Sequence, residues 1–144
     1  MHKGFYASGF LFNSSSQQIL LQQTADTSDG NVWGLFGRNV RNEQDAKTQF
    51  QAIFIDLFSF QLNLNDIFEV YSYESPQFKN IQTIYYAEIP DEVFTIPANV
   101  QAEWFSFKQI QKLPLVPQAK HDIMIAKRVI ESHKRRSLGL HTIG

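Results

Sequence analysis

The sequence contains no cysteine, which excludes disulfide bonds and thiolate metal sites. A chain without thiols suits a reducing compartment, so we predict a cytoplasmic location. An excess of one charge is missing as well, because 13 Lys and Arg residues face 14 Asp and Glu residues and leave a net charge of −1. Proteins that bind nucleic acid polymers usually carry a basic excess, and we therefore predict no such partner.

Long apolar runs are also absent, and the longest fall well short of the roughly 20 residues that a membrane-spanning helix needs. The amino-terminal apolar run breaks at Asn13, and Ser and Gln residues follow where a secretory signal would have its cleavage site. We expect neither a membrane partner nor a signal peptide. The length of 144 residues fits one domain, with a core predicted at about 5–134 and a tail at 135–144.

Aromatic side chains are plentiful, with 13 Phe, 5 Tyr and 2 Trp available for a core. Five large apolar residues recur at the i, i+3, i+4, i+7, i+8 spacing of one helical face, which predicts an amphipathic helix over about 43–58. They are Phe50, Ile53, Phe54, Leu57 and Phe58. Asn42 can cap this helix, with Asp45 three residues later in the manner of a capping box.

Six other segments have the composition of strands, and most are bounded by turn-forming residues. They are 4–12, 18–22, 33–36, 68–73, 81–89 and 100–105. The third ends at Phe36, and a loop that begins with Gly37 is expected before the helix. Ser106 and Gln109 predict a capped short helix stopped by Pro114 and Pro117, and a last helix is predicted over 121–134. This order predicts an α+β fold with a mixed sheet between helices.

Three stretches, together with the order of elements, resemble the Nudix (MutT-like) superfamily. The stretch 9–23 resembles its opening hairpin, and W-x-L-x-G at 33–37 resembles its W-x-L-P-G-G sequence. AEWFSFKQIQKLPL at 102–115 resembles its late strand and short helix. The resemblance implies an α/β/α sandwich that hydrolyses nucleoside diphosphates linked to another moiety, with Mg²⁺ or Mn²⁺ as cofactor.

The family motif is G-x5-E-x7-R-E-U-x-E-E-x-G-U, where U is a bulky apolar residue, and it fits this chain in two frames. If Gly37 takes the glycine position, Glu43 is the first Glu and Asp56 belongs to the Glu pair. Gln51-Ala52 then replace Arg-Glu, and Ile55 fills the other place of the pair.

If Arg38 takes the glycine position, Gln44 replaces the first Glu and Asp56-Leu57 stand for the Glu pair. Ala52-Ile53 then replace Arg-Glu. We favour this second frame because it places Phe54 and Phe60 at the two apolar positions. In both frames Asp56 is the one carboxylate that the helix keeps out of three.

Mg²⁺ is held by oxygen ligands in near-ideal octahedral geometry, and one carboxylate is a poor holder for it. The resemblance therefore implies weak or lost hydrolysis and a remaining nucleotide-binding or regulatory role. Asp56 and Glu43 are candidate catalytic residues and metal ligands, against the alternative of solvated acids on a helix. Arg38 and Arg41 are candidate phosphate ligands, against the alternative of a solvated loop.

Two other functions stay open at this stage. An active hydrolase could recruit acids from outside the motif, for which the candidates are Glu43, Glu88, Glu92 and Glu103. A structural or protein-interaction module, as a homodimer, would suit the aromatic content. Four tyrosines could stack on a base or belong to the core, namely Tyr71, Tyr73, Tyr85 and Tyr86.

Overall fold

The computed structural model of the chain describes residues 4–24, 32–91 and 94–137. The strands are β1 Gly4–Asn13, β2 Gln18–Thr24, β3 Val32–Gly34, β4 Phe36–Val40, β5 Ile67–Ser75, β6 Asn80–Ile89 and β7 Ala102–Ser106. The helices are α1 Ala46–Phe58, α2 Phe107–Ile110 and α3 Pro117–Ser137, and the short 3-10 turns are η1 Glu43–Asp45 and η2 Leu64–Asp66. Among these residues no helix has both the length and the apolar character to cross a bilayer.

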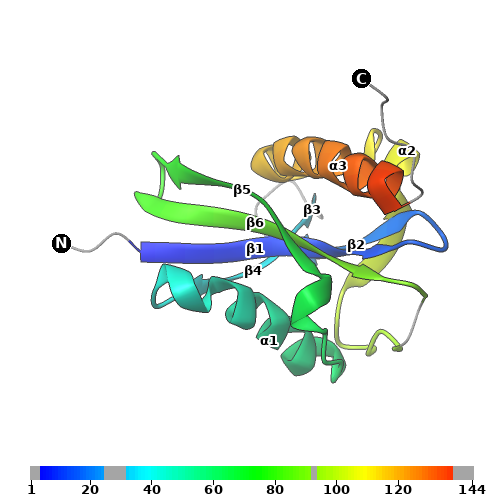
Figure 1. Cartoon of the computed structure of the whole chain (residues 1–144), viewed down its shortest axis with the longest axis horizontal. Helices are drawn as coiled ribbons and strands as arrows, with labels where there is room; N and C mark the ends of the chain where they lie inside the picture. Colours follow the sequence, from blue (N-terminus) through cyan, green and yellow to red (C-terminus); the bar gives the residue numbers. More distant parts are fainter. Residues whose placement is uncertain (1–3, 25–31, 92–93, 138–144) are drawn as a thin grey trace.

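The strands form one mixed sheet in which β1 is central. Strand β1 pairs antiparallel with β2 and β4 and parallel with β6, in a register that runs from Gly4 opposite Asn80 to Asn13 opposite Ile89. Strand β5 pairs antiparallel with β6 at one edge. Helix α1 covers one face of the sheet, while α2 and α3 cover the other (Figure 1). The predicted α/β/α sandwich with a mixed sheet is therefore confirmed.

Each face of the sheet has its own core, because successive side chains of a strand point to opposite faces. On β1, Ala7 and Leu11 belong to the core beneath α1, whereas Phe10 and Phe12 belong to the core beneath α3. The α1-side core is built mainly from Ala7, Leu11, Phe36, Phe50, Phe54 and Tyr85. The α3-side core is built mainly from Phe10, Phe12, Tyr86, Phe105, Ile123 and Ile130.

Helix α1 matches its sequence pattern closely. Phe50, Phe54 and Phe58 lie four residues apart on the buried face, and successive ring centroids are 5.1 and 6.0 Å apart. Asn42 caps the preceding 3-10 turn by accepting a hydrogen bond from the Asp45 backbone nitrogen. The helix ends at Ser59, whose φ of 53° is in the left-handed region that normally favours glycine.

Several expectations about element boundaries were wrong. Beyond Gly37, where a loop was expected, β4 continues to Val40 because β1 offers a pairing edge and Phe36 and Val40 both point into the α1-side core. Pro117 does not stop a helix but begins α3, since proline has no amide hydrogen to lose at the first helical position. Helix α3 also continues to Ser137, beyond the end of the helix predicted over 121–134.

Candidate functional site

An ion pair joins β4 to α1 on the face that the family motif would occupy. Arg38 Nη2 donates to Asp56 Oδ2 at 2.7 Å, and Arg38 Nη1 donates to Gln49 Oε1 at 3.4 Å. The two charged side chains are 33% and 59% exposed. An ion pair with this much solvent contact contributes about 0–1 kcal/mol to stability. The fold therefore depends little on it, and both groups remain accessible.

The two candidate metal ligands cannot hold the same ion. Glu43 and Asp56 are separated by thirteen positions of continuous helical chain, which corresponds to roughly 20 Å of rise. Asp56 is also already paired with a guanidinium. Within the parts of the chain that the structure describes, no three His, Asp or Glu side chains gather as metal ligands. The described residues therefore do not form the divalent cation site that the resemblance implied.

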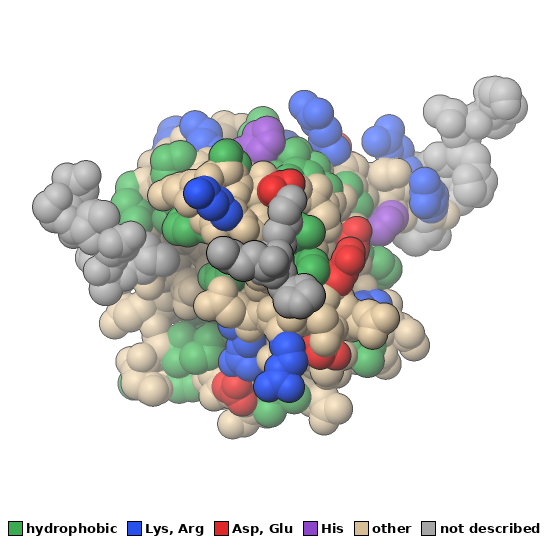
Figure 2. All heavy atoms as spheres, turned by 90° about the vertical axis from the view of Figure 1, so that its left-hand side faces the viewer, with side chains coloured by type: hydrophobic (Ala, Val, Ile, Leu, Met, Phe, Trp, Pro, Cys, Tyr) green, Lys and Arg blue, Asp and Glu red, His purple; other side chains and the backbone are tan. Residues whose placement is uncertain are grey.

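Among the described residues, the other candidate acids do not join Glu43 or Asp56 in a metal site. Glu88 lies on β6 and Glu103 lies on β7, where both are exposed. Glu92 lies outside the described residues. Figure 2 shows Lys and Arg side chains beside Asp and Glu side chains over the lower part of the molecule, where α1 lies. This surface is mixed in charge rather than uniformly acidic. Arg41, exposed after β4, stays a prediction as a phosphate ligand.

The opposite face of the sheet has a cleft of about 500 Å³, which we call the α3 cleft. It lies between the sheet and the amino-terminal end of α3, and β1, β4, β5, β6 and α3 all contribute side chains. The polar and aromatic ones that matter below are Tyr6, Tyr73, Phe78, Gln82, Gln118 and Asp122. Phe78, at the turn between β5 and β6, is 63% exposed. The cleft thus has a polar wall and an exposed aromatic ring.

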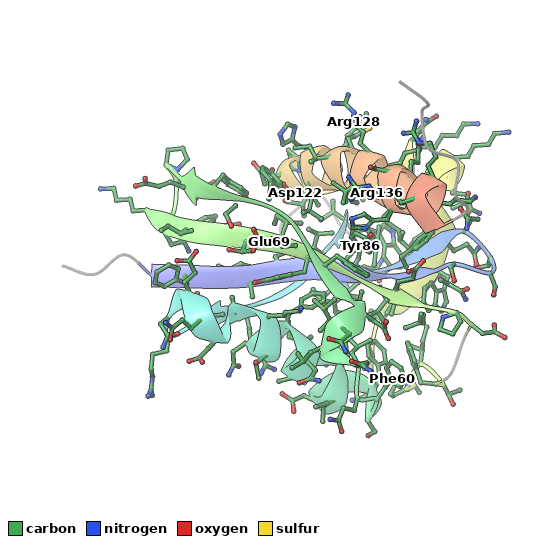
Figure 3. All side chains as sticks on the ribbon, in the orientation of Figure 1. Phe60, Glu69, Tyr86, Asp122, Arg128 and Arg136 are labelled. Atoms are coloured by element: carbon green, nitrogen blue, oxygen red, sulfur yellow. The ribbon has the colours of Figure 1, made fainter. Side chains whose placement is uncertain are left out.

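Asp122 is the one charged side chain that is buried among the described residues, with 2% exposure. Its Oδ1 accepts hydrogen bonds from Tyr71 Oη at 2.5 Å and from Gln118 Nε2 at 2.9 Å. Burial raises the pKa of Asp122, while the two donated hydrogen bonds oppose that rise. Figure 3 shows Asp122 on the side of α3 that faces the sheet and Arg128 on its outer side.

The tyrosines of β5 share this environment. Burial, and then the nearby Asp122 carboxylate, raise the pKa of Tyr73 to about 12 and the pKa of Tyr71 as well. Both phenols therefore stay protonated and act as donors near neutral pH. The other two candidate tyrosines lie elsewhere, since Tyr85 belongs to the α1-side core and Tyr86 to the α3-side core.

Gly37 has a packing role at this cleft. A Cβ atom added there would lie 2.5 Å from Tyr6 Oη and 2.6 Å from Tyr6 Cε2, so the ring of Tyr6 rests against the glycine. Burial raises the pKa of Tyr6. A side chain at position 37 would therefore require the Tyr6 ring to move.

A second cavity, of about 620 Å³, lies near the carboxyl-terminal end of α3. Its wall includes Tyr86, whose hydroxyl lies 2.5 Å from His133 Nδ1, and the ring of Phe68, whose centroid is 5.0 Å from that of His133. Glu88 and Arg136 also line it. Tyr86 and His133 are 47 positions apart, so no local spacing in the sequence could have connected them.

Asp122 could have been found from the sequence. It lies four residues before Ala126 and eight before Ile130, which places it on the inward stripe of the predicted last helix. A carboxylate on an apolar helix face has to find partners or a cavity, because an unpaired buried charge is costly. Gln118 lies outside the predicted helix, because α3 begins at Pro117, four residues before the predicted start at 121.

Comparison with known proteins addresses the fold. No protein-family model matches the sequence, and no curated protein matches it. Among solved structures, the Nudix domain of Shewanella oneidensis NrtR in complex with ADP ribose is 16% identical, with a TM-score of 0.70 and 90% of each chain covered. A MutT/Nudix family protein from Listeria innocua is 15% identical, with a TM-score of 0.66 and coverage of 96% of this chain and 99% of that one.

A third similar structure is the bifunctional NMN adenylyltransferase/ADP ribose pyrophosphatase from Francisella tularensis, complexed with AMP and a manganese ion. It is 11% identical and has a TM-score of 0.62. The match covers 88% of this chain and 42% of that one. At these identities the likeness concerns the arrangement of the elements and not the chemistry. The chain has the fold of the Nudix superfamily.

Proposed function

We propose that this chain binds a nucleotide diphosphate derivative in the α3 cleft, and that its metal-dependent hydrolysis of such compounds is weak or absent. The observation that carries the binding proposal is the buried Asp122 in the wall of a cleft of about 500 Å³. Ligand sites are typically clefts of about 300–1,000 Å³ with a few convergent polar groups. The ADP ribose bound to the NrtR Nudix domain supports this class of ligand.

The chemistry of the cleft suits a nucleotide base. Tyr73 and the exposed ring of Phe78 offer aromatic surfaces, and a base has two faces on which a ring can stack. Asp122 offers carboxylate oxygens to N–H donors on the base edge, and Gln82 and Gln118 carry amides that both donate and accept. A buried acceptor discriminates strongly, because a ligand that lacks the donor leaves it unpaired.

Both frames leave one carboxylate out of three, so the register of the family motif decides only which residues take the acid positions. The end of α1 supports the frame that begins at Arg38. In that frame Ser59 takes the place of the late glycine, and Ser59 has the left-handed backbone that such a glycine would adopt. In the frame from Gly37, Phe58 would take that place, yet Phe58 is a buried residue inside the helix. The carboxylate positions are then Ile53, Asp56 and Leu57.

The test measures binding and turnover separately. ADP ribose, ADP and AMP are titrated by calorimetry and by thermal shift, and release of AMP from ADP ribose is followed with Mg²⁺ or Mn²⁺. A ligand at one hundred times its Kd should stabilise the fold by about 2.7 kcal/mol. We expect the nucleotides to bind and AMP release to stay at background.

Asp122→Asn should weaken binding of the same nucleotides, because an amide NH₂ then opposes a donor of the ligand. Met124→Ala is the matched control on the same helix, since Met124 is 52% exposed and does not line the cleft. If none of the three nucleotides binds at millimolar concentration, the binding proposal fails. Efficient metal-dependent AMP release would refute the proposal of weak hydrolysis.

A further inference from the structure

This inference rests on the proposed function and concerns how the diphosphate is held. We propose that the guanidinium of Arg38 supplies the positive charge that a metal ion would otherwise bring, and that Asp56 is its counter-ion and not a metal ligand. Binding of the nucleotide diphosphate then requires no divalent cation. The observation behind it is that the carboxylate of Asp56 is already engaged by a cation of the chain at 2.7 Å.

The position of Arg38 allows it to serve a ligand seated in the α3 cleft. Its strand neighbour Asn39 lines that cleft, as does Leu35, which immediately precedes β4. Strand β4 pairs with β1 along one side, and no other described strand pairs with it. Adjacent side chains of a strand point to opposite faces, so Arg38 lies on the α1 face and Asn39 on the face of the cleft. A ligand in the cleft therefore has to pass around only this one edge strand to bring its phosphates to Arg38.

The guanidinium has capacity for an anion. Of its five N–H donors, two are used by Asp56 and Gln49 among the described residues, which leaves three. The planar fork of arginine matches phosphate oxygens in a bidentate way, and such charge-assisted hydrogen bonds are among the strong ones. A diphosphate carries more charge than one carboxylate and can compete with Asp56 for these donors.

The two roles of Asp56 predict opposite signs for one substitution. If Asp56 held a metal ion, Asp56→Asn would weaken nucleotide diphosphate binding. If Asp56 is a counter-ion, Asp56→Asn removes a competitor of the phosphates and should tighten binding. Since an exposed ion pair of this kind is weak, we expect a gain of about two- to fivefold in affinity.

The experiment compares ADP with adenosine by calorimetry, in EDTA and in Mg²⁺, on the full chain. Adenosine lacks the diphosphate, so it reports the α3 cleft without Arg38. We expect ADP to bind equally well in EDTA and in Mg²⁺. Arg38→Gln should weaken ADP binding about tenfold and leave adenosine binding unchanged. Arg128→Gln, on the outer side of α3, is the matched charge control and should change neither (Figure 3).

The outcomes separate this inference from the proposed function. If ADP binds in Mg²⁺ but not in EDTA, or if Arg38→Gln binds ADP like the parent chain, the inference is overturned while nucleotide binding stands. Weaker ADP binding by Asp56→Asn also overturns it. If neither adenosine nor ADP binds under either condition, the proposed function fails and this inference fails with it. Thermal unfolding of each variant shows whether the fold is intact.

Discussion

Gly9→Ala is the substitution for which the structure gives the clearest magnitude. A Cβ atom on Gly9 would lie 2.0 Å from the backbone oxygen of Tyr85 and 2.8 Å from Cε1 of Phe50. The oxygen belongs to β6, the parallel neighbour of β1, and cannot rotate away as a side chain would. Overpacking a core costs typically 1–3 kcal/mol. We expect Gly9→Ala to lose about 3 kcal/mol or more, because a backbone atom at the centre of the sheet has to move.

Gly4→Ala is the control for this prediction. It lies on the same strand, and the nearest atom to an added Cβ is Cβ of Asn80 at an ordinary 3.8 Å. Its stability should stay within about 0.5 kcal/mol of the parent chain. Urea unfolding followed by tryptophan fluorescence and by circular dichroism measures both variants. The reasoning is refuted if the free energy of unfolding of Gly9→Ala lies within about 1 kcal/mol of that of the parent chain. A loss that small is common for substitutions that create no clash with the backbone.

Three other predictions concern the helices. Ser59→Gly should stabilise the chain by about 0.5–1 kcal/mol in urea unfolding, because glycine relieves the left-handed φ of 53° at this exposed helix end. Asp122 has a raised pKa in the folded state, so its contribution to stability is complete below the unfolded value near 3.8 and is lost as pH rises through the folded pKa. Asp122→Asn should flatten that slope when unfolding is measured across pH, whereas an unchanged slope would assign it to other groups. Ile53→Glu should cost about 3 kcal/mol or more in the same urea assay, because it buries a carboxylate without a partner.

Local sequence patterns predicted those elements whose formation depends on residues close together in the chain. The aromatic stripe of α1 required a helix because its apolar residues fit only the helical period, and the structure buries Phe50, Phe54 and Phe58 together. The capping box of α2 is present as predicted, with Ser106 and Gln109 each bonding the other's backbone nitrogen. These features depend on residues within one helical turn, so the sequence contains all the information that they need.

Features that depend on distant partners were not predicted. Strand β4 has three polar or glycine positions out of five, and it is a strand because β1 pairs with it. The α3 cleft depends on how far α3 lies from the β5–β6 turn, which no spacing encodes. The pairing of Arg38 with Asp56 was not predicted for the same reason, because the two residues lie 18 positions apart on a strand and a helix.

Two of the positions on α1 that would hold a metal ion are occupied by residues that contribute to the α1-side core. In the frame from Arg38, two of the three carboxylate places are Ile53, which is 4% exposed, and Leu57, which packs against the same core. Acids there would exchange favourable apolar contacts for buried charge. Asp56 differs because its side chain is 59% exposed, so a carboxylate there costs little whether or not it binds anything. An acid at this position is therefore weak evidence for a metal site, whereas its contact with Arg38 gives it a partner that the chain itself provides.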